Sequence, residues 1–287
     1  MNQISRSVSL LAWAFNEELL VERFLVRALE TMEKLVGDFE IIVVDDGSTD
    51  STPRLLSESA AKDSRIKILT NPRNLNVGLS CRTAISAATK DIIFWQTIDW
   101  SYDLKNLGVF LRLLDHYDVV QGFRPTPVRV LSYIPVVKSI YRVKTRSDNM
   151  VKAYISLSNY YLLRILFGAP FQDFQNVTFY RTKYVQNLSL SGTTPFVNPE
   201  LLINAYYDGK RIIEVPIPFT RRSVGKGKGT RMPILVRTVI DIFRNWFSWG
   251  IRLRLKGPKG EIDRVSQPFV LDEAVLESCL PLFKYLK

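Results

Sequence analysis

The first 120 residues alternate between short apolar runs and helical patterns, and this alternation restricts the fold more than any other feature of the chain. The apolar runs are nearly continuous, which predicts strands that are buried on both faces. We expect these strands at 7–15, 39–46, 66–70, 91–96 and 117–121. Helical patterns fill the intervals, at 17–36, 79–89 and 103–115, and a further helix is expected to begin within the segment 47–56. Such βα alternation indicates an α/β fold with a mostly parallel sheet and helices on both faces.

The regular alternation ends after residue 121. We expect a long helical stretch at 134–166, a strand at 176–181, a helix at 199–208 and a strand at 211–219. The segment 221–231 then holds three glycines among five basic residues, which predicts a loop. It is either an exposed turn or a site that captures an anion, because glycine lets backbone N–H groups approach an anion while Lys and Arg supply charge.

Several kinds of site are excluded by residues that the chain lacks. The two cysteines, Cys81 and Cys279, are too few and too far apart for a disulfide scaffold or a Cys-rich zinc module. His116 is the single histidine, which excludes His-dependent triads and multi-His metal sites. A divalent cation would therefore need oxygen ligands.

Two features bear on where the protein works. The apolar run near the N-terminus meets charged residues at once, without a signal-peptide cleavage pattern, and no uninterrupted apolar stretch reaches the roughly 18 residues of a membrane span. We expect a cytoplasmic protein, with any membrane contact peripheral and at the inner face.

The net charge of +11 is unevenly distributed. Residues 1–120 hold 13 basic and 17 acidic side chains, whereas residues 121–287 hold 26 basic and 11 acidic ones. The basic half is either an ordinary solvated surface or a binding surface for an anionic membrane, phosphate-bearing ligands or nucleic acid. We expect no nucleic-acid partner, because the basic half contains no recognised nucleic-acid-binding module.

The segment 232–256 has the pattern of an amphipathic helix. Its polar residues Arg237, Asp241, Arg244 and Ser248 recur at helical spacing among apolar and aromatic residues. Arg and Trp on such a helix suit a membrane interface. Packing on its own domain or on a second copy of the chain is the alternative.

Acidic residues follow two of the predicted strands. Asp45 and Asp46 stand at the carboxyl end of the second predicted strand, and Asp99 comes after the fourth. The carboxyl ends of parallel strands are where ligands bind in such sheets. Helix capping is the alternative role for the Asp pair, although Ser48 and Thr49 offer capping groups nearer the helix. The chain has no GxxxxGK[ST] motif and no GxGxxG after its first strand, so a nucleotide's phosphates would be held by a metal on carboxylates together with Arg or Lys.

These residues resemble a known family. The segments FEIIVVDDGSTDST, Asn76-Val77-Gly78, Thr97-Ile98-Asp99 and EVPIPFTRRSVGKGK occur in the order and spacing of family 2 glycosyltransferases with the GT-A fold. The last segment is similar to that of the dolichol-phosphate mannose synthase-like subgroup, which transfers a sugar to a polyprenyl phosphate. The resemblance covers about residues 7–230 and implies a GT-A domain there. That domain divides into a nucleotide-sugar half (1–120) and an acceptor half (121–230), and residues 231–287 form a C-terminal amphipathic region at a membrane or in a dimer.

The resemblance implies a role for each matching residue. Asp99 would hold Mg²⁺ or Mn²⁺ that bridges the diphosphate, and Asp173 would organise the acceptor or metal site. The donor-binding residues are Glu17, Asp45, Asp46, Asn76, Gly78 and Asp99. The residues that bind phosphate or acceptor are Arg124, Arg222, Gly225, Lys226 and Lys228. Asp99, Asp173 and Arg222 are the predicted catalytic residues.

The chemistry agrees with these residue types. A cation and Arg or Lys neutralise the charge that develops on a nucleoside-diphosphate leaving group. A phosphate acceptor is already ionised near neutral pH and needs no strong base, so the absence of a catalytic His is no obstacle. The resemblance implies inversion at the anomeric carbon.

Four positions depart from the family pattern, namely Trp13, Thr97, Ser101 and Gly227. Thr97 stands at the first Asp of the DxD motif, which removes one carboxylate from the metal site. We predict transfer of a hexose from a UDP- or GDP-sugar to a polyprenyl phosphate. The alternatives are transfer to a saccharide, glycolipid or small-molecule hydroxyl, with Asp173 as the base, and nucleotide-sugar binding without transfer.

Overall fold

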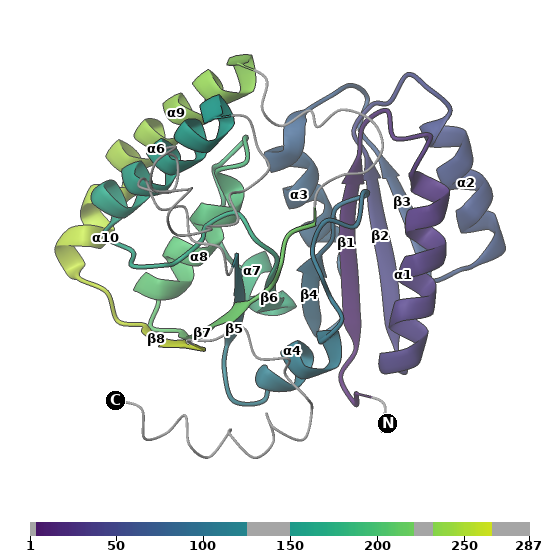
Figure 1. Ribbon diagram of the computed structural model, residues 1–287, viewed down its shortest axis with the longest axis horizontal. Helices are drawn as coiled ribbons and strands as arrows, with labels where there is room; N and C mark the ends of the chain where they lie inside the picture. Colours follow the sequence, from purple (N-terminus) through teal and green to yellow (C-terminus); the bar gives the residue numbers. More distant parts are fainter. Residues whose placement is uncertain (1–3, 125–149, 221–231, 266–287) are drawn as a thin grey trace, which may run out of the picture.

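The computed structural model describes residues 4–124, 150–220 and 232–265, in which a sheet lies between helices (Figure 1). The strands of these residues are β1 (Val8–Ala14), β2 (Phe39–Asp45), β3 (Ile66–Thr70), β4 (Ile92–Trp95), β5 (Val119–Phe123), β6 (Thr178–Arg181), β7 (Arg211–Pro216) and β8 (Glu261–Arg264). The helices are α1 (Val21–Leu35), α2 (Thr52–Lys62), α3 (Asn76–Ala87), α4 (Leu107–Leu113), α6 (Met150–Phe167), α7 (Thr182–Gln186), α8 (Val197–Tyr207), α9 (Met232–Asn245) and α10 (Ile251–Lys256). A π-helical turn, Trp246–Gly250, joins α9 to α10.

The strands of the described residues form one sheet in the order β3-β2-β1-β4-β6-β5-β7-β8. Strand β6 is antiparallel to both of its neighbours, and every other neighbouring pair is parallel. The predicted mostly parallel sheet is therefore confirmed. The order reverses at β1, which has β2 on one side and β4 on the other, and such a switch point is where α/β sheets bind ligands.

The apolar runs account for the strands at the centre of the sheet. Every residue of β2 and β4 is buried, as expected for strands covered on both faces. The ring of Phe94 in β4 stacks on that of Phe179 in β6, with centroids 5.0 Å apart. Burial of such aromatic pairs contributes on the order of 1 kcal/mol beyond the area that they cover.

Three elements of the second half differ from what the sequence predicts. Strand β6 runs antiparallel, α7 follows it directly, and β8 adds to the sheet beside β7. Strand β8 comes from the predicted C-terminal region 231–287, so that region contributes to the same sheet as the rest of the chain. The first part of the predicted helical stretch, 134–149, lies outside the described residues, as does the predicted loop 221–231.

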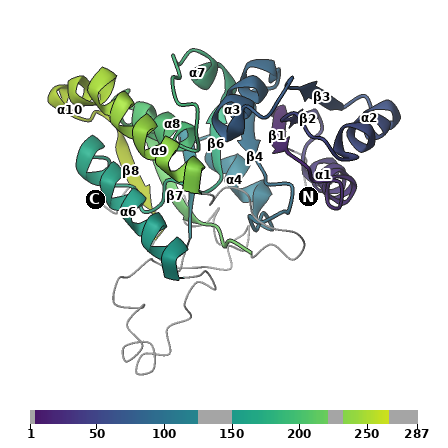
Figure 2. The same cartoon turned by 90° about the horizontal axis from the view of Figure 1, so that it is seen from above.

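Helices α6 and α9 lie side by side, at the opposite end of the molecule from α1 and α2 (Figures 1 and 2). Helix α6 contacts the π-helical turn that follows α9: the ring of Phe167 in α6 lies 5.5 Å from that of Trp246 and 5.2 Å from that of Trp249. Phe167 also contacts the buried Phe196. The sequence left a membrane interface and packing on the protein as alternatives for this segment, and its two Trp residues, which are partly buried, pack against the core.

Candidate active site

Loops from three strands meet at the carboxyl edge of the sheet. Backbone pairing sets Ala14 of β1 opposite Asp45 of β2, and Leu11 of β1 opposite Trp95 of β4. The loops after β1 and β2 are then joined through Asn16, whose backbone N–H donates to Ser48 Oγ at 2.9 Å and whose Oδ1 accepts from Thr49 N at 2.7 Å. The sequence placed polar residues after these strands, and the sheet brings them together.

Asp46 is buried and holds the next loop. One carboxylate oxygen accepts from Asn71 Nδ2 at 2.8 Å and from Leu75 N at 2.9 Å, and the other accepts from Asn76 N at 3.0 Å. This carboxylate therefore fixes the start of α3, where the predicted donor residue Asn76 lies. Asn71 was missed by our sequence analysis, although its position directly after the strand 66–70 is a signal that could have found it.

Asp45 differs from Asp46 in its partners. Its Oδ1 accepts from Ser48 N at 3.1 Å. Its Oδ2 is buried and, within the residues that the structure describes, accepts no hydrogen bond. A buried carboxylate oxygen without a partner is costly, and a donor from a ligand or a water would satisfy it.

The backbone of this edge is strained at three residues. Asn16, Asn76 and Trp100 have φ of 53°, 71° and 52°, and they follow β1, β3 and β4. In the described part of the chain these are the non-glycine residues with positive φ, a conformation that costs about 1–3 kcal/mol each and that clusters at functional sites. Gly47 also has positive φ, and a Cβ there would lie 2.4 Å from the carbonyl carbon of Arg73.

Asp99 lies half-buried in the turn after β4. Its Oδ1 accepts from Ser101 Oγ at 2.6 Å, and Ser101 N donates to Thr97 Oγ1 at 2.9 Å. Two of the positions that depart from the family pattern thus orient Asp99. No group of three His, Cys, Asp or Glu side chains in the described ranges is arranged to hold a metal. A cation at Asp99 would therefore take its other ligands from diphosphate and water, which Mg²⁺ accepts readily.

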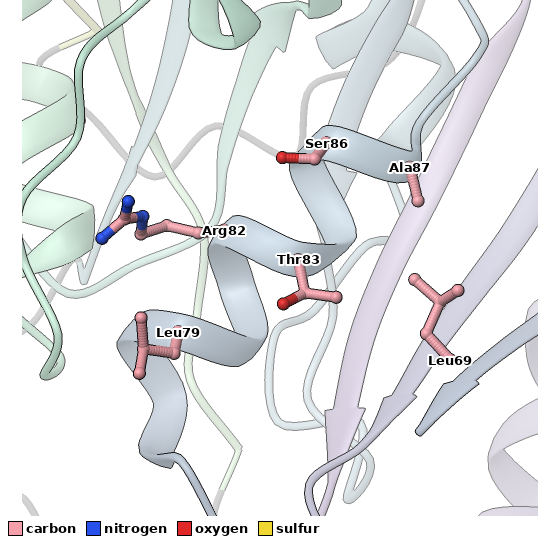
Figure 3. Close-up of a pocket in the computed structure, with 6 residues that line it drawn as sticks. All are labelled: Leu69, Leu79, Arg82, Thr83, Ser86 and Ala87. Atoms are coloured by element: carbon pink, nitrogen blue, oxygen red, sulfur yellow. The ribbon is translucent and has the colours of Figure 1, made fainter. Parts of the chain in front are cut away.

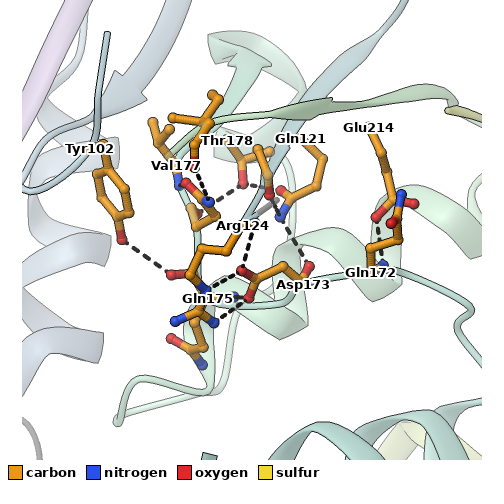
Figure 4. A network of polar contacts seen from close by, with 12 residues as sticks. Tyr102, Gln121, Arg124, Gln172, Asp173, Gln175, Val177, Thr178 and Glu214 are labelled. Carbon is orange, nitrogen blue, oxygen red and sulfur yellow. Dashed lines mark hydrogen bonds and ion pairs between the residues drawn. The ribbon is translucent and has the colours of Figure 1, made fainter. Parts of the chain in front are cut away.

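Arg124 and Asp173 form an ion pair with each other (Figure 4). Arg124 Nε lies 2.5 Å from Asp173 Oδ2, and Nη2 lies 2.7 Å from Oδ1. Gln175 N also donates to Asp173 Oδ1, at 3.0 Å. The structure thus brings together two of the predicted site residues, as partners in a bidentate pair.

The Tyr102 side chain lies within electrostatic range of this pair and of Asp99. Its hydroxyl donates to Gln175 O at 3.2 Å, and its backbone carbonyl accepts from Gln96 Nε2 at 2.9 Å. Burial raises the pKa of Tyr102, and the charges of Asp173 and Asp99 add to this effect, while Arg124 opposes it. The phenol is therefore a neutral hydrogen-bond donor. Sequence analysis missed Tyr102, because the chain contains 12 tyrosines and none of them is marked by a motif.

The other predicted residues fall into three groups. Glu17 is buried, and its backbone N–H donates to Thr52 Oγ1 at 2.8 Å. Gly78 lies against the backbone of Thr193 and Thr194. The predicted phosphate-binding residues of the glycine-rich segment lie outside the described residues, namely Arg222, Gly225, Lys226 and Lys228.

An open depression of about 520 Å³ lies beside α3 and β3 (Figure 3). Its lining residues are Leu69, Leu79, Arg82, Thr83, Ser86 and Ala87. None of them is among the predicted site residues, and this depression is separate from the carboxyl-edge site.

Comparison with known proteins decides the family. The model of the family described as "Glycosyl transferase family 2" matches residues 9–171, which is more than half of the chain. The chain belongs to glycosyl transferase family 2. The predicted family is thereby confirmed, and the strand switch point with Asp45, Asp46 and Asp99 lies within the matched residues.

Two similar proteins come from Haloferax volcanii. Glycosyltransferase AglD is 26% identical over 258 residues, which cover 86% of this chain and 38% of AglD. A dolichyl-phosphate hexose transferase is 28% identical over 189 residues, which cover 65% of this chain and 72% of that protein. The family 2 chain thus spans well under half the length of AglD.

Solved structures confirm the GT-A fold. Glucosyl-3-phosphoglycerate synthase from Mycobacterium tuberculosis, solved with Mn²⁺ and UDP-glucose, superposes with a TM-score of 0.57. The sequences are 17% identical, and the match covers 84% of this chain and 79% of the other. At this identity the likeness of the family 2 chain to the synthase is one of fold.

Proposed function

We propose that this protein transfers a hexose from a UDP- or GDP-sugar to a polyprenyl phosphate at the cytoplasmic face of a membrane, with inversion at the anomeric carbon. The observation that carries the proposal is the acidic carboxyl edge at the strand switch point, beside the Arg124–Asp173 pair. Membership of family 2 and the relative named dolichyl-phosphate hexose transferase support the same reaction class.

On this proposal the donor lies across the carboxyl ends of β1, β2 and β4. Asp45 Oδ2 would gain the hydrogen-bond donor that it lacks in the described residues. Asp99, held by Ser101, would bind Mg²⁺ or Mn²⁺ on the diphosphate, and the cation would stabilise the charge of the leaving group. Arg222 and Lys228 stay predicted phosphate ligands.

The state of Asp173 favours a phosphate acceptor over a hydroxyl acceptor. A hydroxyl needs a general base within hydrogen-bond reach, but both oxygens of Asp173 are already bound to Arg124 and one also accepts from Gln175 N. These hydrogen bonds occupy the lone pairs with which a general base would accept a proton. An acceptor phosphate arrives ionised, so the pair can orient it without removing a proton.

The exposed side chains of α9 and α10 support a membrane location, because they are apolar and are flanked by basic residues. We call seven exposed side chains of these helices and the turn between them the apolar face: Val236, Val239, Ile240, Phe243, Phe247, Ile251 and Leu255. The exposed charged residues of 233–256 are all basic, namely Arg237, Arg244, Arg252, Arg254 and Lys256. Asp241, the single carboxylate of that segment, is buried.

We infer that the apolar face rests on an anionic lipid surface. Apolar side chains would enter the acyl boundary while the flanking Arg and Lys contact lipid phosphates. Among the described residues, no helix is both long enough and apolar enough to cross a bilayer.

The test is a transfer assay with purified protein, Mg²⁺ or Mn²⁺, a panel of UDP- and GDP-sugars and a short polyprenyl phosphate, followed by mass spectrometry. We expect a glycosylated lipid phosphate, and a loss of at least about 100-fold in rate for Asp99→Ala, as when a charge-stabilising group is removed. Asp103→Ala is the matched control on the same loop and should keep full activity.

Two other outcomes would redirect the assignment. Transfer to a saccharide or small-molecule hydroxyl, abolished by Asp173→Asn, would identify Asp173 as a base and reject the phosphate acceptor. Binding of UDP or GDP in the same samples without transfer to any acceptor would indicate a nucleotide-sugar-binding protein.

A further inference from the structure

The buried side of α9 carries a carboxylate that the proposed reaction does not use. Asp241 is 4% exposed, and its Oδ2 accepts three hydrogen bonds from one turn. The donors are Thr193 N at 2.8 Å, Thr194 N at 3.1 Å and Thr194 Oγ1 at 2.8 Å. A carboxylate that accepts several backbone N–H groups fixes that backbone strongly.

The same turn is held from its other side by Glu200 of α8. Its carboxylate accepts from Ser191 N at 2.9 Å and from Gly192 N at 2.8 Å. Residues 191–194 are therefore clasped between two buried carboxylates, one from α8 and one from α9. We call residues 191–194 the clasped turn.

The backbone of the clasped turn packs directly against Gly78 in the Asn76-Val77-Gly78 motif. A Cβ on Gly78 would lie 2.3 Å from the carbonyl carbon of Thr193 and 2.5 Å from Thr194 N. These distances leave no room for a side chain, so the turn lies directly against the first turn of α3. The position of α3 thus depends on where Asp241 holds the turn.

The other side of the α3 N-terminus belongs to the donor edge. Asp46 accepts hydrogen bonds from Leu75 N and Asn76 N. A continuous series of contacts therefore runs from Asp46, through the start of α3 and the clasped turn, to Asp241.

We propose that Asp241 is a positioning residue for the nucleotide donor: through the clasped turn it holds Asn76 and Gly78 in the conformation that binds nucleotide. This inference rests on the proposed function, because it takes the start of α3 as part of the donor site. Asp241 lies on the opposite side of α9 from the apolar face, so one helix carries both the membrane contact and the support of the donor site.

The proposal makes a selective kinetic prediction. Loss of Asp241 should raise the KM for the nucleotide sugar and leave the KM for the lipid acceptor unchanged. A purely structural role would instead lower the amount of folded enzyme, and with it the rate, at unchanged KM for both substrates.

The experiment measures the affinity for UDP and for GDP, each with Mn²⁺, by calorimetry. We expect Asp241→Ala to bind about tenfold more weakly than the unaltered chain. Asp241→Asn should restore most of the affinity, because its amide oxygen can still accept from the turn. Glu40→Gln is the control for a buried, hydrogen-bonded carboxylate remote from α9 and should bind like the unaltered chain.

A double-mutant cycle with Gly78→Ala identifies the route. If both changes act through the contact of Gly78 with the clasped turn, their effects on nucleotide affinity are not additive. Additive effects would show that Asp241 acts by another route and would overturn the proposal.

The remaining outcomes are also decisive. A folded Asp241→Ala protein that binds nucleotide within twofold of the unaltered chain overturns the proposal. If Asp241→Ala does not fold, Thr194→Val is the second variant, because it removes one of the three hydrogen bonds that Asp241 Oδ2 accepts. It must then weaken nucleotide binding about threefold. Unchanged nucleotide binding by Thr194→Val overturns the proposal. Failure of the unaltered chain to bind either nucleotide refutes the proposed function itself.

Discussion

At the scale of single residues, the Arg124–Asp173 pair changes what the site can do. Both residues were predicted to act on ligands, and in the structure each is the partner of the other. Asp173 is almost fully buried, while Arg124 keeps a fifth of its side chain exposed. The guanidinium is therefore the more exposed member of the pair, while the carboxylate stays covered.

Removing Arg124 alone should lower the free energy of unfolding more than removing both charges of the pair. Arg124→Ala leaves a buried carboxylate without its counter-ion, and we expect a loss of about 3 kcal/mol in the free energy of unfolding. Adding Asp173→Asn should recover part of that loss. Urea unfolding of the two variants measures the difference, and a double variant no more stable than the single one would contradict it.

Sequence reasoning predicted Asp45, Asp46 and Asp99 as site residues because each lies at or after the end of a strand whose apolar run is plain. The pairing of Arg124 with Asp173 was not predictable in the same way. Arg124 follows β5 and Asp173 precedes β6, and the two meet because β6 turns antiparallel beside β5. Nothing in the apolar pattern of either strand reveals that direction.

At the scale of elements, α9 shows why helical spacing is not enough to assign a face. Arg237, Asp241, Arg244 and Ser248 form one polar series in the sequence, but Asp241 is buried while the other three are exposed. The turn after it is π-helical, and Gly250 there is packed so closely that a Cβ would lie 2.6 Å from Phe167 Cε1. Arg237, Asp241 and Arg244 all precede this turn, so their different burial is decided by what packs against α9 and not by their spacing.

Glu40 shows how elements of the first half are joined. It lies on β2 and accepts hydrogen bonds from Ser9 Oγ on β1 at 2.6 Å and from Thr89 N after α3 at 2.7 Å. Lys67 of β3 pairs with it at 2.6 Å. Burial alone would raise the pKa of Glu40, but the bonds from Lys67, Ser9 and Thr89 together outweigh burial and hold that pKa below its usual value.

This depressed pKa predicts how stability depends on pH. The folded state favours the charged form, so Glu40 stabilises the protein above the ordinary carboxyl pKa, and this contribution is lost as pH falls through the folded-state value. At neutral pH, Glu40→Gln should cost about 2 kcal/mol. At pH values below the folded-state pKa of Glu40, the two proteins should converge in unfolding free energy. A constant difference across the acid range would contradict this assignment.

At the scale of the whole molecule, the net positive charge and most of the exposed large apolar side chains of the described residues lie in the second half. The excess of basic residues after position 120 includes the exposed Arg and Lys beside the apolar face. The alternation of the first half predicted the parallel sheet, because each strand there is followed by its own helix. It could not predict β8, whose short, partly exposed strand carries no apolar run.

The proposed membrane contact should depend on the apolar face and on lipid charge. We expect the protein to pellet with vesicles that contain phosphatidylglycerol and much less with phosphatidylcholine alone. Ile240→Ser with Phe247→Ser should reduce pelleting about tenfold or more, since each loses apolar burial of roughly 1.5–3 kcal/mol, at unchanged thermal stability. Leu19→Ser with Val26→Ser is the control, because these residues are equally exposed near and on α1. An equal loss of pelleting in the two double variants would show that the apolar face of α9 and α10 is not the membrane contact.

The place of β6 between β4 and β5 has a consequence for synthesis on the ribosome. In the described sheet, β1, β2 and β3 pair only within the first four strands, and β4 pairs with β1 on one side, so this part of the sheet can assemble as soon as β4 has emerged. Strand β5 is made next but is linked to those strands only through β6, which follows the whole of α6. Until β6 is translated, β5 has no edge to join, and a chain that pauses there exposes a buried apolar strand to chaperones and to other nascent chains.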